Sequence, residues 1–144
     1  MQNTGILTIA DEAIVEPGTF TTDWRDGLES MAEADVLIDF NGGSPGAKGS
    51  ASNSITAYLQ TSLDLGETAI DLWSVSFTTP AGSFALQLKP NGRINTPSDG
   101  AMQVNKIADG IVLGDRLRLK YVVEGTYAEN PGRSSRLKVR AHVR

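Results

Sequence analysis

A chain of 144 residues is long enough to bury one hydrophobic core, and a second domain is not expected. The absence of cysteine excludes disulfide bonds, thiolate metal sites and a cysteine nucleophile. The net charge of −4 argues against nucleic acid as a partner, and no apolar run approaches the roughly 18 residues of a membrane span. The first residues lack the basic head and apolar stretch of a signal peptide, so we expect assembly in the cytoplasm.

Charge is unevenly distributed along the chain. Residues 1–39 carry nine acids against the single base Arg25, whereas residues 116–144 carry eight bases against Glu124 and Glu129. Asymmetry between the two halves of a chain is a signal about partners, although it can also be neutralised inside the fold.

Residues 1–30 are expected to form an N-terminal arm or an edge segment. Small apolar clusters near Ile6 and Ile14 are followed by Pro17-Gly18 and a Thr-rich stretch. Such a segment either adds an edge strand or becomes ordered against a partner. Farther along, apolar residues recur at helical spacing over 28–32, which allows at most one short helix before a strand that begins at Val36.

Period-two alternation dominates residues 31–144, which are expected to form one β-domain. Over 83–89, 116–124 and 135–143, apolar side chains alternate with polar ones, so one face of each strand is buried. Gly and Pro turn signals separate the runs, and the last two runs are candidates for antiparallel pairing. The sequence predicts an all-β protein with a single antiparallel β-sandwich of the jelly-roll kind.

The chain contains no recognisable set of catalytic residues. The Gly-rich segment 41–50 predicts a flexible exposed loop, but Gly49 follows Lys48 where a P-loop requires Ser or Thr. His142, the only histidine, has neither triad partners nor a cluster of metal ligands near it in the sequence. The acids of 64–71 surround one turn, which offers no cleft for a catalytic carboxylate pair. We therefore expect no enzymatic activity, no metal and no cofactor.

The turn at residues 62–68 has a recognisable spacing. Ser62-x-Asp64-x-Gly66-x-Thr68 resembles the Asp-box turn of sialidase propellers and other β-proteins, except for Ala69 where that motif prefers an aromatic residue. Within such a turn the aspartate can accept backbone N–H groups and the glycine can take a positive φ. The interpretation is a structural corner.

Three stretches together give a wider resemblance. They are the Gly-rich loop at 42–49, a "QTS-D-G-T" hairpin at 60–68, and a "LGD-R-R-K" strand at 113–120 that is followed by "GTY". Over residues 36–144 this succession resembles a family of small virion proteins of tailed bacteriophages and prophages. The hairpin departs from the family pattern, because leucine and alanine replace a second glycine and an aromatic residue.

The resemblance implies a non-enzymatic structural component of the virion, most similar to the jelly-roll cement or decoration proteins of phage heads. Such proteins bind the outer capsid surface as homo-dimers or homo-trimers and clamp neighbouring subunits of the major capsid protein. The particle would be assembled in the host cytoplasm. A tail, baseplate or head-to-tail connector component is an alternative within the virion.

A carbohydrate-binding or host-adhesion module is a further alternative. β-Sandwiches that bind sugars commonly use exposed tryptophan, so Trp24 and Trp73 are the side chains to inspect. Trp73 shares a strand face with Val75 and Phe77 and is expected in the core, whereas the position of Trp24 is open.

Contacts with partners are expected from the N-terminal apolar cluster, one tryptophan and the bases of the last two strands. If these strands are neighbours, their bases form one basic face that needs an acidic cover, because opposed like charges destabilise a sheet. The cover would come from the N-terminal third of this chain, from that of a neighbouring subunit, or from an acidic patch of the major capsid protein. The alternative is a solvated basic face that is screened by salt. The candidate residues are Ile6, Leu7, Ile9, Trp24, Arg116, Arg118, Lys120, Arg136, Lys138 and Arg140.

Overall fold

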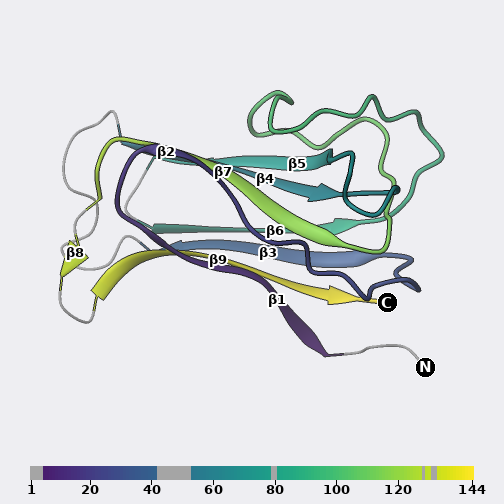
Figure 1. The fold of residues 1–144 in the computed structure, drawn as a ribbon, viewed down its shortest axis with the longest axis horizontal. Coiled ribbons are helices and arrows are strands. Elements are labelled where there is room, and N and C mark those ends of the chain that lie inside the picture. The colour runs from purple at the N-terminus through teal and green to yellow at the C-terminus, as the bar shows by residue number, and fades with distance from the viewer. Residues whose placement is uncertain (1–4, 42–52, 79–80, 128, 131–132) are drawn as a thin grey trace.

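The structure is a computed structural model that describes residues 5–41, 53–78, 81–127, 129–130 and 133–144. Two antiparallel β-sheets face each other across a shared hydrophobic core (Figure 1). The prediction of an all-β antiparallel sandwich is therefore confirmed. The expected Gly-rich loop lies, apart from Asn41, outside the described residues.

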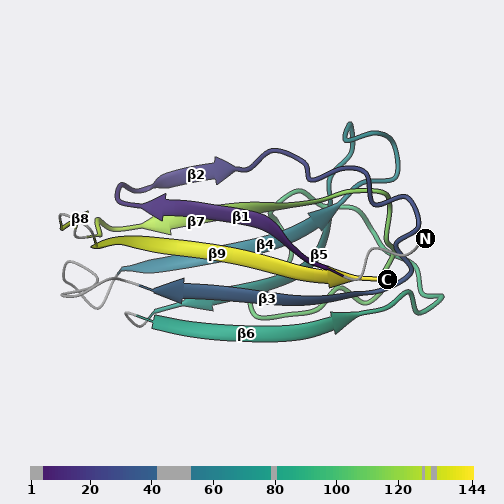
Figure 2. The same cartoon turned by 90° about the horizontal axis from the view of Figure 1, so that it is seen from below.

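The strands pair in a nested order centred on the turn between the fourth and fifth strands. Sheet A has the order β1 (Ile6–Ile14), β9 (Arg133–Val143), β3 (Ala34–Asn41) and β6 (Ala81–Leu88), and the short β8 (Glu129–Asn130) pairs with β9. Sheet B has the order β2 (Gly18–Thr21), β7 (Leu117–Glu124), β4 (Ser54–Thr61) and β5 (Ile70–Phe77). Consequently β4 pairs with β5, β3 with β6, β2 with β7, and β1 with β9 (Figure 2).

Side-chain alternation places the core between the sheets. In β3, Ala34, Val36, Ile38 and Phe40 are buried and the residues between them are more exposed, because successive strand residues face opposite sides. The same alternation holds in β7 and in the described part of β9, as the sequence predicts. At one end of the core the ring of Phe40 meets that of Tyr127 edge to face, 5.5 Å between centroids.

The N-terminal segment supplies an edge strand to each sheet. β1 pairs with β9 at the edge of sheet A, and β2 pairs with β7 at the edge of sheet B. The register of β1 shifts between Thr8 and Ala10, so that both Ile9 and Ala10 are buried. Leu7, Ile9 and Ile14 of the N-terminal apolar clusters are thus part of the core, whereas Ile6 is exposed.

The segment that joins β2 to β3 contains no helix, although Leu28 and Met31 have helical spacing. Both side chains are buried, and the spacing reflects these two contacts with the core. The backbone N–H groups of the segment are bonded elsewhere, that of Arg25 to Leu117 and those of Ala32 and Glu33 to the carbonyl of Arg144. Groups committed to distant strands cannot form the i to i−4 bonds of a helix.

The turn between β4 and β5 has the predicted geometry. The Ser62 hydroxyl donates to Asp64 Oδ1 at 2.8 Å and accepts the N–H of Gly66 at 2.9 Å, while Asp64 Oδ1 accepts the N–H of Thr68 at 2.7 Å. Hydrogen bonds from Thr68 and Ser62 lower the pKa of Asp64 below its ordinary value. Gly66 has the expected positive φ of 91°, and Leu65, where the family pattern has glycine, also has a positive φ of 62°.

Leu65→Gly is expected to raise the free energy of unfolding by about 1 kcal/mol, because glycine takes a left-handed conformation without the steric penalty of a Cβ atom. Urea unfolding followed by circular dichroism measures the change. The matched control is Leu63→Gly, an exposed leucine in the same turn whose φ is not positive, and this variant should be no more stable than the parent. Equal effects at both positions would contradict the proposed strain.

Candidate functional site

The two basic strands lie in different sheets. β7 is an inner strand of sheet B, whereas β9 is inserted between β1 and β3 of sheet A. The prediction that they pair and form one basic face is therefore wrong. Their bases point outward on opposite sides of the sandwich, because alternation fixes which side chains face the core and leaves the partner strand undetermined.

Part of the outer face of sheet B, around β5 and the neighbouring ends of β4 and β7, is covered by the chain itself, whereas the four residues of β2 are exposed. The segment from residue 89 to residue 113, between β6 and β7, runs beside β5 (Figure 1) and adds a backbone bridge between Trp73 and Ile107. Asp71, only 2% exposed, anchors the segment from β5. Its carboxylate accepts hydrogen bonds from the side chains of Gln60 and Ser98 and from the N–H groups of residues 100, 101 and 102, at 2.7–3.2 Å.

The two bases of β7, Arg118 and Lys120, share one carboxylate of this segment, that of Asp99. Lys120 Nζ lies 3.1 Å from Asp99 Oδ1, and the guanidinium of Arg118 lies 3.7 Å from the same oxygen and donates to Gln60 Oε1 at 2.8 Å. A hydrogen bond from Gln60, followed by the bond and charge of Lys120, lowers the pKa of Asp99. Arg116 pairs with its neighbour Asp115 at 2.8 Å. These contacts are internal to the chain.

The tryptophans do not form an exposed aromatic platform. Trp73 is buried in the core, as expected. Trp24 is half-buried on sheet B, with the guanidinium carbon of Arg118 4.2 Å from its ring centroid, a cation–π contact. Its indole nitrogen also lies so close to Gly66 that a Cβ atom there would approach within 2.8 Å. Arg118 and the β4–β5 turn therefore cover surfaces of the Trp24 ring against which a sugar would have to stack.

The outer face of sheet A, by contrast, has no described segment lying across it (Figure 2). We call this surface the A face and define it by the outward residues of four strands. Cross-strand register arranges them in rows from β1 to β6: Ile6, His142, Asp35 and Gln87; Thr8, Arg140, Leu37 and Ala85; Asp11, Lys138, Asp39 and Ser83; Ala13, Arg136, Asn41 and Ala81.

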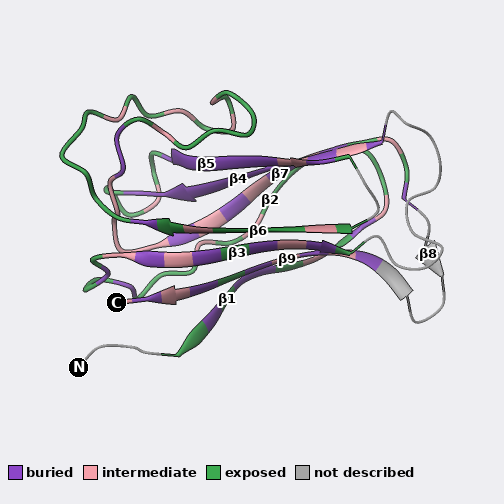
Figure 3. Ribbon diagram, turned by 180° about the vertical axis from the view of Figure 1, so that it is seen from behind, coloured by how far each residue is buried: buried purple, intermediate pink, exposed green. Residues whose placement is uncertain are grey.

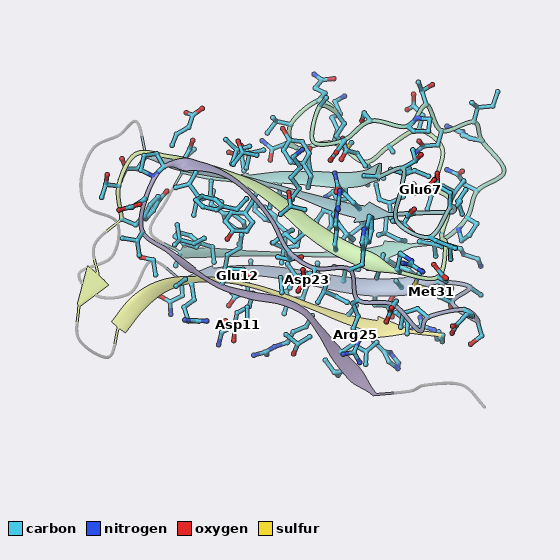
Figure 4. The ribbon with its side chains drawn as sticks, viewed as in Figure 1. Asp11, Glu12, Asp23, Arg25, Met31 and Glu67 are labelled. Atoms are coloured by element: carbon cyan, nitrogen blue, oxygen red, sulfur yellow. The ribbon has the colours of Figure 1, made fainter. Side chains whose placement is uncertain are left out.

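The three bases of the A face differ in whether an acid lies beside them. Arg136 Nε lies 2.7 Å from Asp11 Oδ1, and Figure 4 shows Asp11 and Glu12 on opposite sides of β1. Lys138 stands between Asp11 and Asp39 in the register. Arg140 stands between Thr8 and Leu37 and has no ion-pair partner among the described residues. One base at the centre of the face is thus available to an external carboxylate.

A shallow hollow of about 540 Å³ lies beside Arg140 on the A face. Its apolar lining includes Ile6, which is 67% exposed, and Leu37, together with Ala85. Its polar lining includes Asp35, Gln87, Arg140 and His142. An apolar floor bordered by a few polar groups suits contact with a protein surface.

Acids from the N-terminal third cover part of the basic strand β9. Besides Asp11, Glu33 and Asp35 bind the guanidinium of Arg144 at 2.7 and 2.6 Å. The hydrogen bond from Arg144 is the main cause that lowers the pKa of Asp35, and partial burial opposes it. An acidic cover from the same chain therefore exists for Arg136 and Arg144, while β7 uses Asp99 of the covering segment instead.

Arg144→Gln is expected to raise the pKa of Asp35, because the variant loses the bond that favours the carboxylate. A carboxylate with a lowered folded-state pKa stabilises the fold above its unfolded pKa, and this contribution disappears as the pH falls through the folded value. The stabilisation from Asp35 should therefore be smaller in the variant. NMR titration of the Asp35 carboxyl carbon tests this, with Arg136→Gln, which pairs with Asp11, as the control. An unchanged Asp35 titration would refute the assignment.

Two of the three stretches that carry the family resemblance, the hairpin and the "LGD" strand, meet in space, and the Gly-rich loop at 42–49 lies outside the described residues. Thr61 of the hairpin accepts the N–H of Gly114 at 3.0 Å and donates to the carbonyl of Arg116 at 2.9 Å. Gly114 lies against the carbonyl of Ser62, where any Cβ atom would overlap it. The "QTS" and "LGD" residues thus join β4 to the start of β7, and their role here is architectural.

The candidate contact residues fall into three groups. Ile6, Arg136, Lys138 and Arg140 lie together on the A face; Trp24, Arg116, Arg118 and Lys120 lie on or beside sheet B; Leu7 and Ile9 are buried in the core. The sequence analysis missed Leu37 and Ala85, which adjoin Arg140 on the A face. Leu37 is an apolar residue among the polar outward positions of β3. Only the register of β3 against β9 shows that it lies next to Arg140.

Among the described residues there is no group of three or more His, Cys, Asp or Glu side chains arranged to hold a metal ion. That part of the chain also contains no helix of sufficient length and hydropathy to span a membrane. Comparison with protein-family models, with curated proteins and with solved structures finds no match to this chain.

Proposed function

We propose that this chain is a non-enzymatic structural protein of a bacteriophage virion, and that it acts as a cement protein on the outer surface of the head. The observation that carries the proposal is the A face, a four-stranded surface with no described segment over it and with Arg140 at its centre. On the opposite sheet, the chain's own segment 89–113 covers part of the outer face. The A face would bind the major capsid protein.

The strand order supports a jelly roll as the specific architecture. In a jelly roll, a long antiparallel ribbon is folded so that eight strands divide between two sheets. Nested pairing from β4–β5 outward to β1–β9 is the order that such a ribbon produces. The fold and the hairpin and strand motifs therefore support the same family of virion proteins.

The A face has the chemistry of a surface that binds through many weak contacts. Alternating charges in the row of Asp11, Lys138 and Asp39 can fix register against a complementary surface, while exposed charge pairs contribute little affinity by themselves. Apolar contact around Ile6 and Leu37 would add to this. A protein that attaches to several capsid subunits gains from high effective concentration, so modest single contacts suffice.

The experiment combines the purified protein with expanded heads that lack it and images the particles by cryo-electron microscopy. Density at symmetry-related positions, with the A face toward the shell, is the expected result. Arg140→Glu should reduce occupancy at least tenfold at limiting protein concentration, a loss of about 1.4 kcal/mol. The control is Arg93→Glu, an exposed arginine on the segment that covers sheet B.

Several outcomes would contradict the proposal. Bare heads, with the protein located on tails or connectors, would favour the alternative virion component. Binding to host glycans with bare heads would favour the adhesion module. Equal head binding by both arginine variants would show that the A face is not part of the interface. Deletion of residues 1–20 is unsuitable for this purpose, because it removes β1 and most of β2 from the sandwich.

A further inference from the structure

The four edges of the two sheets are protected to very different degrees. At the edge of sheet B, β5 is covered by the backbone bridge of residue 107. The other edge strand of that sheet, β2, has only four residues and follows Pro17. In sheet A, β1 carries a register shift and the charges of Asp11 and Glu12. Short length, bulges, charges and covering loops are the devices by which proteins prevent edge strands from pairing with other chains.

β6 has none of these devices. It pairs with β3 over eight consecutive residues without a register shift, and it contains no charged residue and no proline. Five of its eight residues are exposed, whereas no residue of the inner strand β4 is (Figure 3). Figure 2 places β6 at the margin of the molecule, with no described segment beyond it. It is a long, regular and uncharged edge.

Apolar side chains beside this edge are incompletely buried. Phe84 faces inward, opposite Ile38 in the register, and its ring packs 5.3 Å from that of Phe77. It nevertheless remains 41% exposed. Leu86, on the same inward side, is also only partly buried. A strand added next to β6 would extend the sheet over both side chains.

We propose that two copies of this chain form a dimer through antiparallel pairing of β6 with β6 about a two-fold axis. The two A sheets would then join into one continuous sheet with the order β1-β9-β3-β6-β6-β3-β9-β1. Each strand would supply backbone groups of residues 82–88 on its outer edge to the other, and the inward Phe84 and Leu86 of both copies would meet on the core side. The inference does not depend on capsid binding.

The absence of charge on β6 favours a second copy as the occupant. In antiparallel pairing about a two-fold axis, the residue at the axis lies opposite its own copy, so a charge near the middle of the edge strand would oppose a like charge. β1, with Asp11 and Glu12, would meet this penalty, and β6 does not. Antiparallel pairing of a strand with its own copy closes the contact, because after dimerisation neither β6 edge is left for a third chain.

Sedimentation and single-cysteine cross-linking test the dimer. At about 100 μM the parent should sediment as a dimer, and Ala85→Lys should raise the dissociation constant at least tenfold, because two lysines then meet near the axis. Ala13→Lys is the matched control, since it places the same charge on the outward face of β1 at the other edge of the same sheet. Circular dichroism and thermal unfolding establish that both variants are folded.

Cysteine substitutions locate the axis, because the parent has no cysteine. Ser83→Cys, Ala85→Cys and Gln87→Cys each place one thiol on the outward side of β6. A residue at the axis is directly opposed to its own copy, with Cβ atoms about 5 Å apart and within reach of a disulfide, so mild oxidation should link the variant nearest the axis most strongly. Ala13→Cys should stay unlinked.

A monomeric parent would overturn the proposal, and so would a trimer or a dimer that Ala85→Lys leaves intact and that no β6 cysteine links. Cross-linking of Ala13→Cys in place of the β6 variants would move the interface to β1. The head-binding experiment tests the cement function and not the dimer. Monomeric protein that still occupies heads would refute the dimer and leave the cement function standing.

Discussion

Asp71→Ala is expected to lower the free energy of unfolding by about 3 kcal/mol and to release residues 96–108 from sheet B. The carboxylate is buried and accepts bonds from two side chains and three successive backbone N–H groups of the covering segment. Alanine leaves these donors without their acceptor in a buried site. Unpaired buried donors are costly, so the effect should exceed that of an ordinary surface substitution.

Two measurements check the Asp71 prediction. Urea unfolding gives the change in free energy, and hydrogen exchange gives the loss of protection at the amides of residues 100–102. Asp109→Ala is the control, because Asp109 is an exposed acid of the same segment. A small loss of stability together with unchanged protection at residues 100–102 would show that other contacts hold the segment.

Gly114→Ala is expected to destabilise the protein by about 3 kcal/mol, because its Cβ atom would overlap the backbone carbonyl of Ser62. Backbone atoms cannot rotate away as a side chain does. The start of β7 or the β4–β5 hairpin would have to shift, and such a shift would strain the hydrogen bonds that Thr61 makes with Gly114 and Arg116.

The control for Gly114 is Gly92→Ala, where a Cβ atom meets no neighbour but φ is +70°. That variant should cost about 1 kcal/mol from backbone conformation alone. Thermal unfolding of both variants separates close packing from conformational strain. If Gly114→Ala is no less stable than Gly92→Ala, the close approach to Ser62 is not a constraint on the sequence.

Local patterns predicted much of the fold because alternation is a local property. The inward residues of β7 and β9 can be read from the sequence alone, and the Asp-box spacing gave the geometry of the β4–β5 turn. Pairing of strands is non-local, so nothing in the two basic runs showed that they join different sheets. Helical spacing at Leu28 and Met31 was misleading for a related reason, because their neighbours' backbone groups bond to strands far along the chain.

The candidate site was only partly predictable. Bases at alternate positions of β9 predicted an outward basic side for that strand, but Leu37 and Ala85 join it in the A face only through the register of three strands. The same limitation applies to Gln60 and Asp71. They occupy outward positions of sheet B and look like solvated polar residues, yet both are buried because residues 89–113 return over them.

The position of β9 inside sheet A also determines when folding can be completed. Asp11 and Arg136, which pair across β1 and β9, are separated by 125 residues of sequence. During synthesis β1 and β3 must therefore wait, with their apolar faces uncovered, until the last strand leaves the ribosome. Long-range pairing of this kind folds slowly. The acidic excess of residues 1–39 gives β1 and β3 a common negative charge, and like charges oppose association of these segments before the basic β9 pairs with them.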